Sequence, residues 1–325
     1  MGKFAEVHRD PHLFPRRRCL PMAGGLLAVA LVAAACSSGT SSSSATGTKS
    51  TSTTMAAASA SIGQGTGPVD VLYAGSLVTM MQTSVDAGFH ETTGYTITGI
   101  SAGSTALAEE ITGGVHVADV LVSASPKADA ALEGPANGTW VTWYATFATS
   151  PLLLAYNPSS KFAATFKSKP WWKVITEPGI HVGRTNPVTD PKGALIVKAV
   201  DQAAAQEHDT ALKSVVASTA DVFPEQTLVG RLQAGQLDAG FFYGVEASAA
   251  KLPTVPLEGV DLGASYTITV VSHAPHAAAA DALVEYFLSA RGKTLLERNG
   301  LTELHAPKLS GNKSAVPSSL KKVLG

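Results

Sequence analysis

Two short segments with the same small-residue pattern constrain this chain most strongly: residues 73–77 (Tyr-Ala-Gly-Ser-Leu) and residues 101–105 (Ser-Ala-Gly-Ser-Thr). Each follows a short apolar run and opens a segment with helical spacing. Small residues let the backbone come close to a ligand, and a serine at a helix start places a hydroxyl beside free backbone N–H groups. Two such helix starts that face one another would form a site for an oxyanion, with Ser76 and Ser104 as its candidate side chains.

Several of these polar residues also have simpler interpretations. Each serine could be a plain N-cap, the commonest role of serine at a helix start, although a cap can also be a ligand. Asp119 is expected to be structural and to bond backbone N–H groups at a strand end. His273 and His276 could suggest a metal pair, but Pro275 makes the segment a turn and no carboxylate or cysteine cluster supports it, so we expect no metal site.

Strands alternate with helices in the first part of the folded region. We expect strands at residues 69–73, 95–100 and 118–122, with a helix from Leu77 to Gly94 and another through Leu107 to Gly113. This alternation indicates a parallel α/β sheet. Ligands of such sheets bind beyond the carboxyl ends of the strands, which is where Ser76 and Ser104 lie.

The later part of the chain predicts a second lobe. Residues 151–158 have the pattern of a buried strand that crosses into it, and 181–185 and 239–243 are further strands, with helices from Trp171 and Ala194. Residues 266–271 form a return strand, and a helix follows from about 277 to 288. The folded part, from Pro68 to Gly325, is long enough for two lobes.

The N-terminus has the pattern of an export signal. Residues 1–36 contain a basic start, an apolar stretch from Leu20 to Ala35, and small residues before Cys36. The apolar stretch is too short for a comfortable transmembrane helix, which needs roughly 20 residues. The pattern is similar to a bacterial lipobox, with Cys36 as the acylated residue; an ordinary secretory signal is the alternative. Residues 37–67, rich in Ser and Thr, predict a flexible tether.

Composition narrows the possible chemistry. Both cysteines, Cys19 and Cys36, lie in the signal region, so the rest of the chain has no thiol for catalysis or for a metal. The chain has 24 basic and 25 acidic residues; residues 1–35 hold five and two of these, so the remainder carries 19 against 23, a net charge of −4. This balance argues against nucleic acid as a partner. A bound anion must then be held by local dipoles and hydroxyls.

The motifs resemble a known family, the substrate-binding lipoproteins of molybdate and tungstate ABC importers, within the two-lobed periplasmic binding proteins. The resemblance covers residues 69–301 and rests on the order and spacing of five short motifs. These are residues 74–77 (Ala-Gly-Ser-Leu), 102–104 (Ala-Gly-Ser), 118–120 (Ala-Asp-Val), 190–193 (Asp-Pro-Lys-Gly) and 238–243 (Asp-Ala-Gly-Phe-Phe-Tyr). The resemblance implies an α/β fold with a hinge and a ligand cleft between the lobes.

The same resemblance implies the residues of the site. Ser76 and Ser104 would bond the oxyanion from the first lobe, Tyr243 would add its hydroxyl, and backbone amides would come from about Lys192 and Thr227. Archaeal tungstate binders of the family add two carboxylates. Asp190 matches the first, but Phe242 stands where the second should fall. This difference favours a tetrahedral oxyanion held only by hydrogen bonds, with Asp190 as a cap for the helix near Ala194.

We therefore expect a lipid-anchored binding protein outside the cytoplasmic membrane, with lobe I at residues 68–150 and 265–325 and lobe II at 151–264. It should capture molybdate or tungstate by closure about the hinge and deliver it to an ABC permease and its ATPase. We expect a monomer without cofactor or enzymatic activity. The alternatives are a binding protein of the same fold for sulfate or another small anion, and an enzyme or adhesion module built on the fold.

Overall fold

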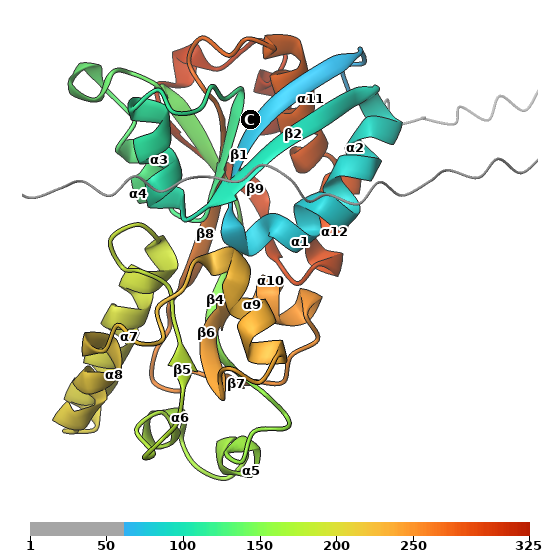
Figure 1. Cartoon of the computed structure of the whole chain (residues 1–325). Coiled ribbons are helices and arrows are strands. Elements are labelled where there is room, and N and C mark those ends of the chain that lie inside the picture. Colours follow the sequence, from blue (N-terminus) through green and yellow to red (C-terminus); the bar gives the residue numbers. More distant parts are fainter. Residues whose placement is uncertain (1–61) are drawn as a thin grey trace, which may run out of the picture. The chain divides into compact units, whose positions relative to one another are not determined.

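A mixed β-sheet connects the strands in the order β2-β1-β3-β8-β4-β6-β5, with β7 and β9 paired to β4 (Figure 1). The computed structural model describes residues 62–325. The strands are β1 (Gly67–Ala74), β2 (Tyr95–Ala102), β3 (Val120–Ser123), β4 (Trp143–Tyr156), β5 (Val182–Gly183), β6 (Ala239–Tyr243), β7 (Thr254–Pro256), β8 (Gly263–Val270) and β9 (Thr302–Gly311).

Helices pack on both faces of this sheet. They are α1 (Val78–Met80), α2 (Asp86–Thr93), α3 (Ser104–Thr112), α4 (Pro126–Ala130), α5 (Ala163–Phe166), α6 (Trp171–Val174), α7 (Pro191–Gln206), α8 (Lys213–Ala217), α9 (Glu225–Gln233), α10 (Gly244–Ala249), α11 (Ala277–Leu288), α12 (Ala290–Arg298) and α13 (Lys321–Leu324). Single 3-10 turns are η1 (Gly75–Leu77), η3 (Pro135–Asn137), η4 (Thr210–Leu212) and η5 (Lys313–Ala315), and η2 (Met81–Val85) is a π-helical stretch between α1 and α2. No helix in residues 62–325 has both the length and the apolar character needed to cross a membrane.

The long strand β4 divides the sheet into two lobes. Up to Pro151 it pairs with β8 and β9, and from Leu152 it pairs with β6 and β7. We call β1, β2, β3, β8, β9 and the first part of β4 the first lobe, and β5, β6, β7 and the end of β4 the second lobe. The crossover strand was expected to begin at residue 151. It begins at Trp143, because an alternating run extends on the amino side of Pro151.

The expected parallel arrangement holds for the start of the first lobe. β1 pairs in parallel with β2 and with β3, and β8 joins β3 as an antiparallel neighbour. Side chains alternate across the strands: Val71 and Tyr73 belong to the large core, whereas Leu72 and Leu121 pack against Leu107 and its neighbours in a second cluster. In Figure 1, α3 and α4 lie on one side of β1, and α2 and α11 lie on the other.

Side chains of β6 in the second lobe also alternate between the two faces of the sheet. Phe241 and Tyr243 of β6 belong to the large core together with Ile196 of α7. Phe242, between them, packs with Leu228 of α9 on the opposite face. α7 and α9 thus cover opposite faces of β6. Lys192 and Glu225, in their first turns, lie close to each other, and Lys192 also contacts Glu246, three residues beyond Tyr243 at the carboxyl end of that strand.

The expected signal peptide, Cys36 and most of the expected tether (37–67) lie outside the described residues. The last part of the tether segment contacts the first lobe. The backbone N–H of Gly65 donates to the carbonyl oxygen of Thr93 at 2.9 Å, and that of Gly63 donates to the Glu285 carboxylate at 3.1 Å. Strand β1 itself begins at Gly67, so the contacts of the folded unit reach back to Gly63.

Asp119 joins β1 to the start of α11, which confirms its expected structural role. Its Oδ2 accepts a hydrogen bond from the backbone N–H of Asp70 at 2.7 Å and lies 2.8 Å from Nδ1 of His276; its Oδ1 accepts from the backbone N–H of His276 at 2.7 Å. The hydrogen bond to Asp119 raises the pKa of His276. The side chains of Asp70, Asp119 and His276 each place one possible metal-ligand atom within 4.8 Å of the others, but both Asp119 oxygens already accept hydrogen bonds.

We expect Asp119→Ala to destabilise the fold strongly. The substitution leaves two backbone N–H groups without their acceptor, and each unsatisfied buried donor costs about 1–3 kcal/mol. Urea denaturation should show a loss of roughly 3 kcal/mol in unfolding free energy. Asp201→Ala, on an exposed position of α7, is the matched control; an equal effect of the two variants would contradict the role of Asp119.

Candidate functional site

The first lobe presents two serines at the ends of paired strands. In the register of β1 and β2, Ala74 lies opposite Ala102. Ser76 lies in η1 two residues beyond Ala74, and Ser104 opens α3 two residues beyond Ala102. Carboxyl ends of neighbouring parallel strands share one edge of the sheet, so the register brings both serines to the same edge.

Both serine hydroxyls are buried, and both accept a hydrogen bond. Ser76 Oγ accepts from the hydroxyl of Tyr266 at 2.9 Å, and Ser104 Oγ accepts from the backbone N–H of Ala124 at 2.9 Å. Neither serine is the N-cap; that position belongs to Ala74 and Gly103. A hydroxyl that accepts one bond still carries a hydrogen to donate. The two serines thus keep their donor capacity, and the plain N-cap interpretation was wrong.

The second lobe contributes a buried ammonium group with carboxylates around it. Nζ of Lys192, on the first turn of α7, donates to both oxygens of Glu246 at 2.7 and 2.8 Å. Nζ also lies 2.9 Å from Oε1 of Glu225. Lys192 is fully buried and the two glutamates nearly so, hence the three charges are largely removed from water. Such a cluster is stable only while the charges compensate one another.

Burial sets the protonation behaviour of this cluster. Burial, with the nearby Glu225 charge, raises the pKa of Asp190 to about 8. Burial also raises the pKa of Glu246 to about 7, against the opposing effect of Lys192. For Lys192, burial alone would lower the pKa, but the Glu225 and Glu246 carboxylates raise it above the ordinary value. The ammonium therefore keeps its charge near neutral pH, whereas the two carboxyl groups exchange protons there.

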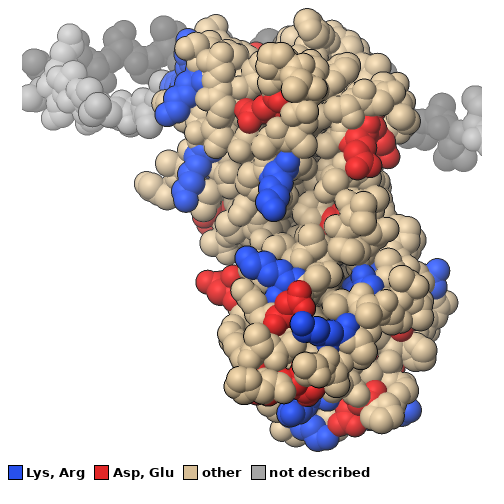
Figure 2. Space-filling view, turned by 90° about the vertical axis from the view of Figure 1, so that its left-hand side faces the viewer, with Lys and Arg blue, Asp and Glu red and all other residues tan. Residues whose placement is uncertain are grey.

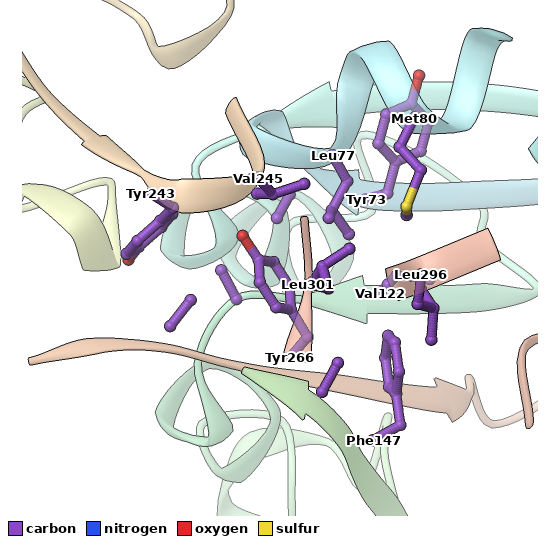
Figure 3. Close-up of a cluster of buried hydrophobic side chains, with 14 of the residues drawn as sticks. Tyr73, Leu77, Met80, Val122, Phe147, Tyr243, Val245, Tyr266, Leu296 and Leu301 are labelled. Atoms are coloured by element: carbon purple, nitrogen blue, oxygen red, sulfur yellow. The ribbon is translucent and has the colours of Figure 1, made fainter. Parts of the chain in front are cut away.

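Two tyrosines border the same region. The rings of Tyr243 and Tyr266 lie 6.3 Å apart, and in Figure 3 their hydroxyl groups point to different sides. Tyr266 donates to Ser76, whereas the buried hydroxyl of Tyr243 has no hydrogen-bond partner among the described residues. Burial raises the pKa of Tyr243 well above its usual range, so the group remains a neutral donor. An unpaired buried hydroxyl is a candidate ligand contact.

Thr185 is a second unpaired hydroxyl, and sequence reasoning missed it. It follows β5, whose Gly183 lies opposite Gly240 of β6, so Thr185 lies near the carboxyl ends of both strands. Its Oγ1 is buried without a partner in the described part of the chain. Together with Asp190 and Gly103 it lines a cavity of about 410 Å³ between the lobes.

The two expected amide donors are both engaged elsewhere. The backbone N–H of Lys192 donates to Oδ1 of Asp190 at 2.7 Å, so Asp190 is the N-cap of α7 as expected, although the helix begins at Pro191. Thr227 lies on the exposed side of the first turn of α9, and its N–H donates to the carbonyl oxygen of Pro224 at 3.1 Å. Of the five expected ligand residues, Lys192 thus offers its side chain, and Thr227 is turned to its own helix.

Glycines let the lobes touch. A Cβ on Gly75 would lie 2.7 Å from Oε2 of Glu225, and a Cβ on Gly103 would lie 2.4 Å from the carbonyl oxygen of Thr189. The N–H of Ala106 donates across to the same Thr189 oxygen at 3.1 Å. The glycines of the two small-residue motifs are therefore required for close approach of the second lobe, in addition to any approach of a ligand.

The cleft is more highly charged than the sequence suggested. Where only uncharged donors were expected, the second lobe places one ammonium and three carboxyl groups. On the face of the molecule that Figure 2 shows, positively and negatively charged residues are scattered rather than clustered. Glu225 was missed because it follows Pro224 and looks like an ordinary first helix residue. Glu246, three residues after Tyr243, accepts from the Tyr243 backbone N–H at 2.9 Å and gave no signal of its own.

Comparisons with known proteins agree with this architecture. Residues 69–302 match the family model for bacterial extracellular solute-binding protein. An uncharacterized solute-binding protein of Petrotoga mobilis is 23% identical over 279 residues, which cover 74% of this chain and 85% of the relative. The molybdate/tungstate-binding protein WtpA of Pyrococcus abyssi is 25% identical over 234 residues, covering 56% and 67%.

A solved structure shows the same fold. The periplasmic molybdate-binding protein of Azotobacter vinelandii matches with a TM-score of 0.53 at 16% identity, covering 72% of this chain and 98% of that protein. The fold is therefore the two-lobed α/β fold of periplasmic binding proteins, as expected. The chain belongs to the family of bacterial extracellular solute-binding proteins.

The raised carboxyl pKa values predict a pH-dependent stability. A carboxyl group whose folded-state pKa lies above its unfolded value stabilises the fold fully below the unfolded pKa, and this contribution is lost as pH rises through the folded pKa. Asp190 and Glu246 should therefore lower the unfolding free energy between about pH 5 and pH 8.

Asp190→Asn isolates one part of this dependence, because asparagine can still cap α7. Chemical denaturation at several pH values should give a shallower decline in the variant, by about 1.4 kcal/mol per pH unit for one proton. Parallel stability curves for the two proteins would contradict the assignment.

Proposed function

We propose that this protein is the substrate-binding component of an ABC importer and that it captures molybdate or tungstate between its two lobes. The observation that carries the proposal is the pair of serines at register-matched strand ends. The second lobe adds the unpaired buried hydroxyls of Tyr243 and Thr185. The names of the similar proteins from Pyrococcus and Azotobacter support the choice of ligand.

The chemistry of the donors suits a tetrahedral oxyanion. A dianion loses much hydration energy when it leaves water, so most of its oxygen lone pairs must find donors. Hydroxyl hydrogens of Ser76, Ser104, Tyr243 and Thr185 could each supply a bond worth roughly 1.5–3 kcal/mol to a charged group. Nζ of Lys192 adds a cation, which the sequence-based hypothesis did not include. That ammonium is paired with Glu225 and Glu246, so it becomes available to an anion only when one carboxylate gives way.

Closure follows from the connections between the lobes. The chain passes between them within β4 at Pro151 and again before β8 at Gly263, and these residues lie opposite each other. A small rotation at this paired crossing would open the cleft without breaking either half of the sheet. In the proposed cycle the anion meets Ser76 and Ser104 first, and the second lobe then closes over it. Capture and release, without covalent chemistry, is the activity proposed.

The proposed location is the outer face of the cytoplasmic membrane. Acylation of Cys36 and the Ser/Thr-rich segment after it would hold the folded unit near the permease. The similarity to extracellular solute-binding proteins supports export. Mass spectrometry of the membrane-extracted protein tests the anchor, since an N-terminal diacylglyceryl-cysteine at position 36 is expected and an unmodified N-terminus would contradict it.

Calorimetric titration of the purified protein with molybdate, tungstate, sulfate and phosphate tests the proposed ligand. We expect heat of binding with the first two anions and competition between them. Binding of sulfate alone would assign the alternative ligand, and no heat from any of the four would contradict oxyanion capture.

Ser76→Ala and Ser104→Ala should each weaken molybdate binding. Loss of one hydrogen bond to a charged group corresponds to roughly a 10- to 100-fold increase in Kd. Ser84→Ala, a serine in η2 away from the cleft, is the control and should bind as the wild type does. Unchanged affinity in both cleft variants would remove the serines from the site.

A further inference from the structure

Glu225 occupies a central position in the cleft. It is the first residue of α9 in the second lobe, yet its carboxylate reaches the backbone of Gly75 in the first lobe. It lines a cavity of about 170 Å³ together with Ser76, and also the cavity of about 410 Å³ that Thr185 lines. Glu225 therefore borders both spaces, one lined by Ser76 and the other by Thr185.

Glu225 is held less firmly than the other carboxylate of the cluster. Both oxygens of Glu246 accept from Nζ of Lys192, and one of them also accepts from the backbone N–H of Tyr243. Oε1 of Glu225 lies 2.9 Å from the same Nζ, but it accepts no hydrogen bond with proper geometry from any described residue. Glu246 thus accepts three hydrogen bonds, whereas Glu225 is held to Lys192 by the ion pair alone.

The charges around Glu225 oppose a further anion. From α7 it faces Lys192 with Asp190 beside it, from the end of β6 and from α10 it faces Tyr243 and Glu246, and from β8 it faces Tyr266. The turn η1 and the carboxyl end of β2 present no titratable side chain. One ammonium is thus surrounded by three carboxyl groups, and like charges in a desolvated site cost several kcal/mol.

We propose that Glu225 is a carboxylate gate: an oxyanion takes its place beside Lys192, and the Glu225 side chain swings out of the cleft. The inference rests on the proposed function, because it concerns the same cleft. Rotation is possible since Glu225 lies on the first turn of its helix, directly after Pro224 at the cleft edge. The gate makes Lys192 available only to a ligand that can replace a carboxylate, and so selects anions over neutral solutes.

Proton uptake is the measurable consequence. An anion placed next to Asp190 and Glu246 raises the pKa of both groups above their values of about 8 and about 7. Groups that are ionised in the free protein at pH 8 then bind protons in the complex. By linkage, affinity must rise as pH falls, by up to about tenfold per pH unit for each proton taken up.

The test is calorimetry with molybdate at pH 8 in two buffers of different ionisation enthalpy, on wild type, Glu225→Gln and Glu207→Gln. The difference in heat between buffers gives the number of protons exchanged. We expect uptake of about one proton by the wild type. Glu225→Gln removes the competing charge, so it should bind molybdate about tenfold more tightly. Glu207→Gln, exposed at the end of α7, should match the wild type.

The outcomes separate the gate from the proposed function. Molybdate binding without proton exchange, or weaker binding by Glu225→Gln, overturns the gate and leaves the oxyanion site standing. Absence of heat with molybdate, tungstate, sulfate and phosphate in both proteins overturns the oxyanion site and the gate together. Thermal unfolding checks that Glu225→Gln is folded; if it is not, the proton count of the wild type alone decides.

Discussion

The buried ammonium of Lys192 is the interaction on which the arrangement of the second lobe depends. It ties the N-terminus of α7 to the start of α10 through Glu246, and it attracts Glu225 at the start of α9. A lysine without these carboxylates could not remain charged at full burial. Three helix starts are thereby gathered at the carboxyl end of β6, the edge where ligands of α/β sheets bind.

The first lobe is organised by a different interaction. Its geometry comes from backbone pairing, because the register of β1 and β2 sets Ser76 and Ser104 two residues past opposed alanines. Glycines at positions 75 and 103 then remove the side chains that would hold the second lobe away. One wall of the cleft is thus organised by hydrogen-bonded strands and the other by compensated charge.

The sequence predicted the first wall far better than the second. Short-range patterns predicted strands β1 and β2, the two serines just beyond their ends, and the Asp190 cap. Each of these features lies within a few residues of the pattern that indicates it. Lys192 appeared as a turn residue, since lysine is rarely buried unless it is paired, and its partners are distant in the chain. Only the fold brings Lys192 to Glu246, 54 residues away. Similarly, the sequence did not indicate a role for Tyr266 or Thr185, because that role depends on the groups around their hydroxyls.

The central claim is that an oxyanion lies between the two lobes, in contact with Ser76 and Lys192. X-ray diffraction from crystals grown with tungstate tests it directly, because tungsten gives an anomalous signal that no protein atom can imitate. We expect one strong peak in the cleft, bordered by residues 76, 104, 192 and 243, with the Glu225 carboxylate displaced from Lys192. A cleft without tungsten, or tungsten bound only elsewhere on the surface, would contradict it.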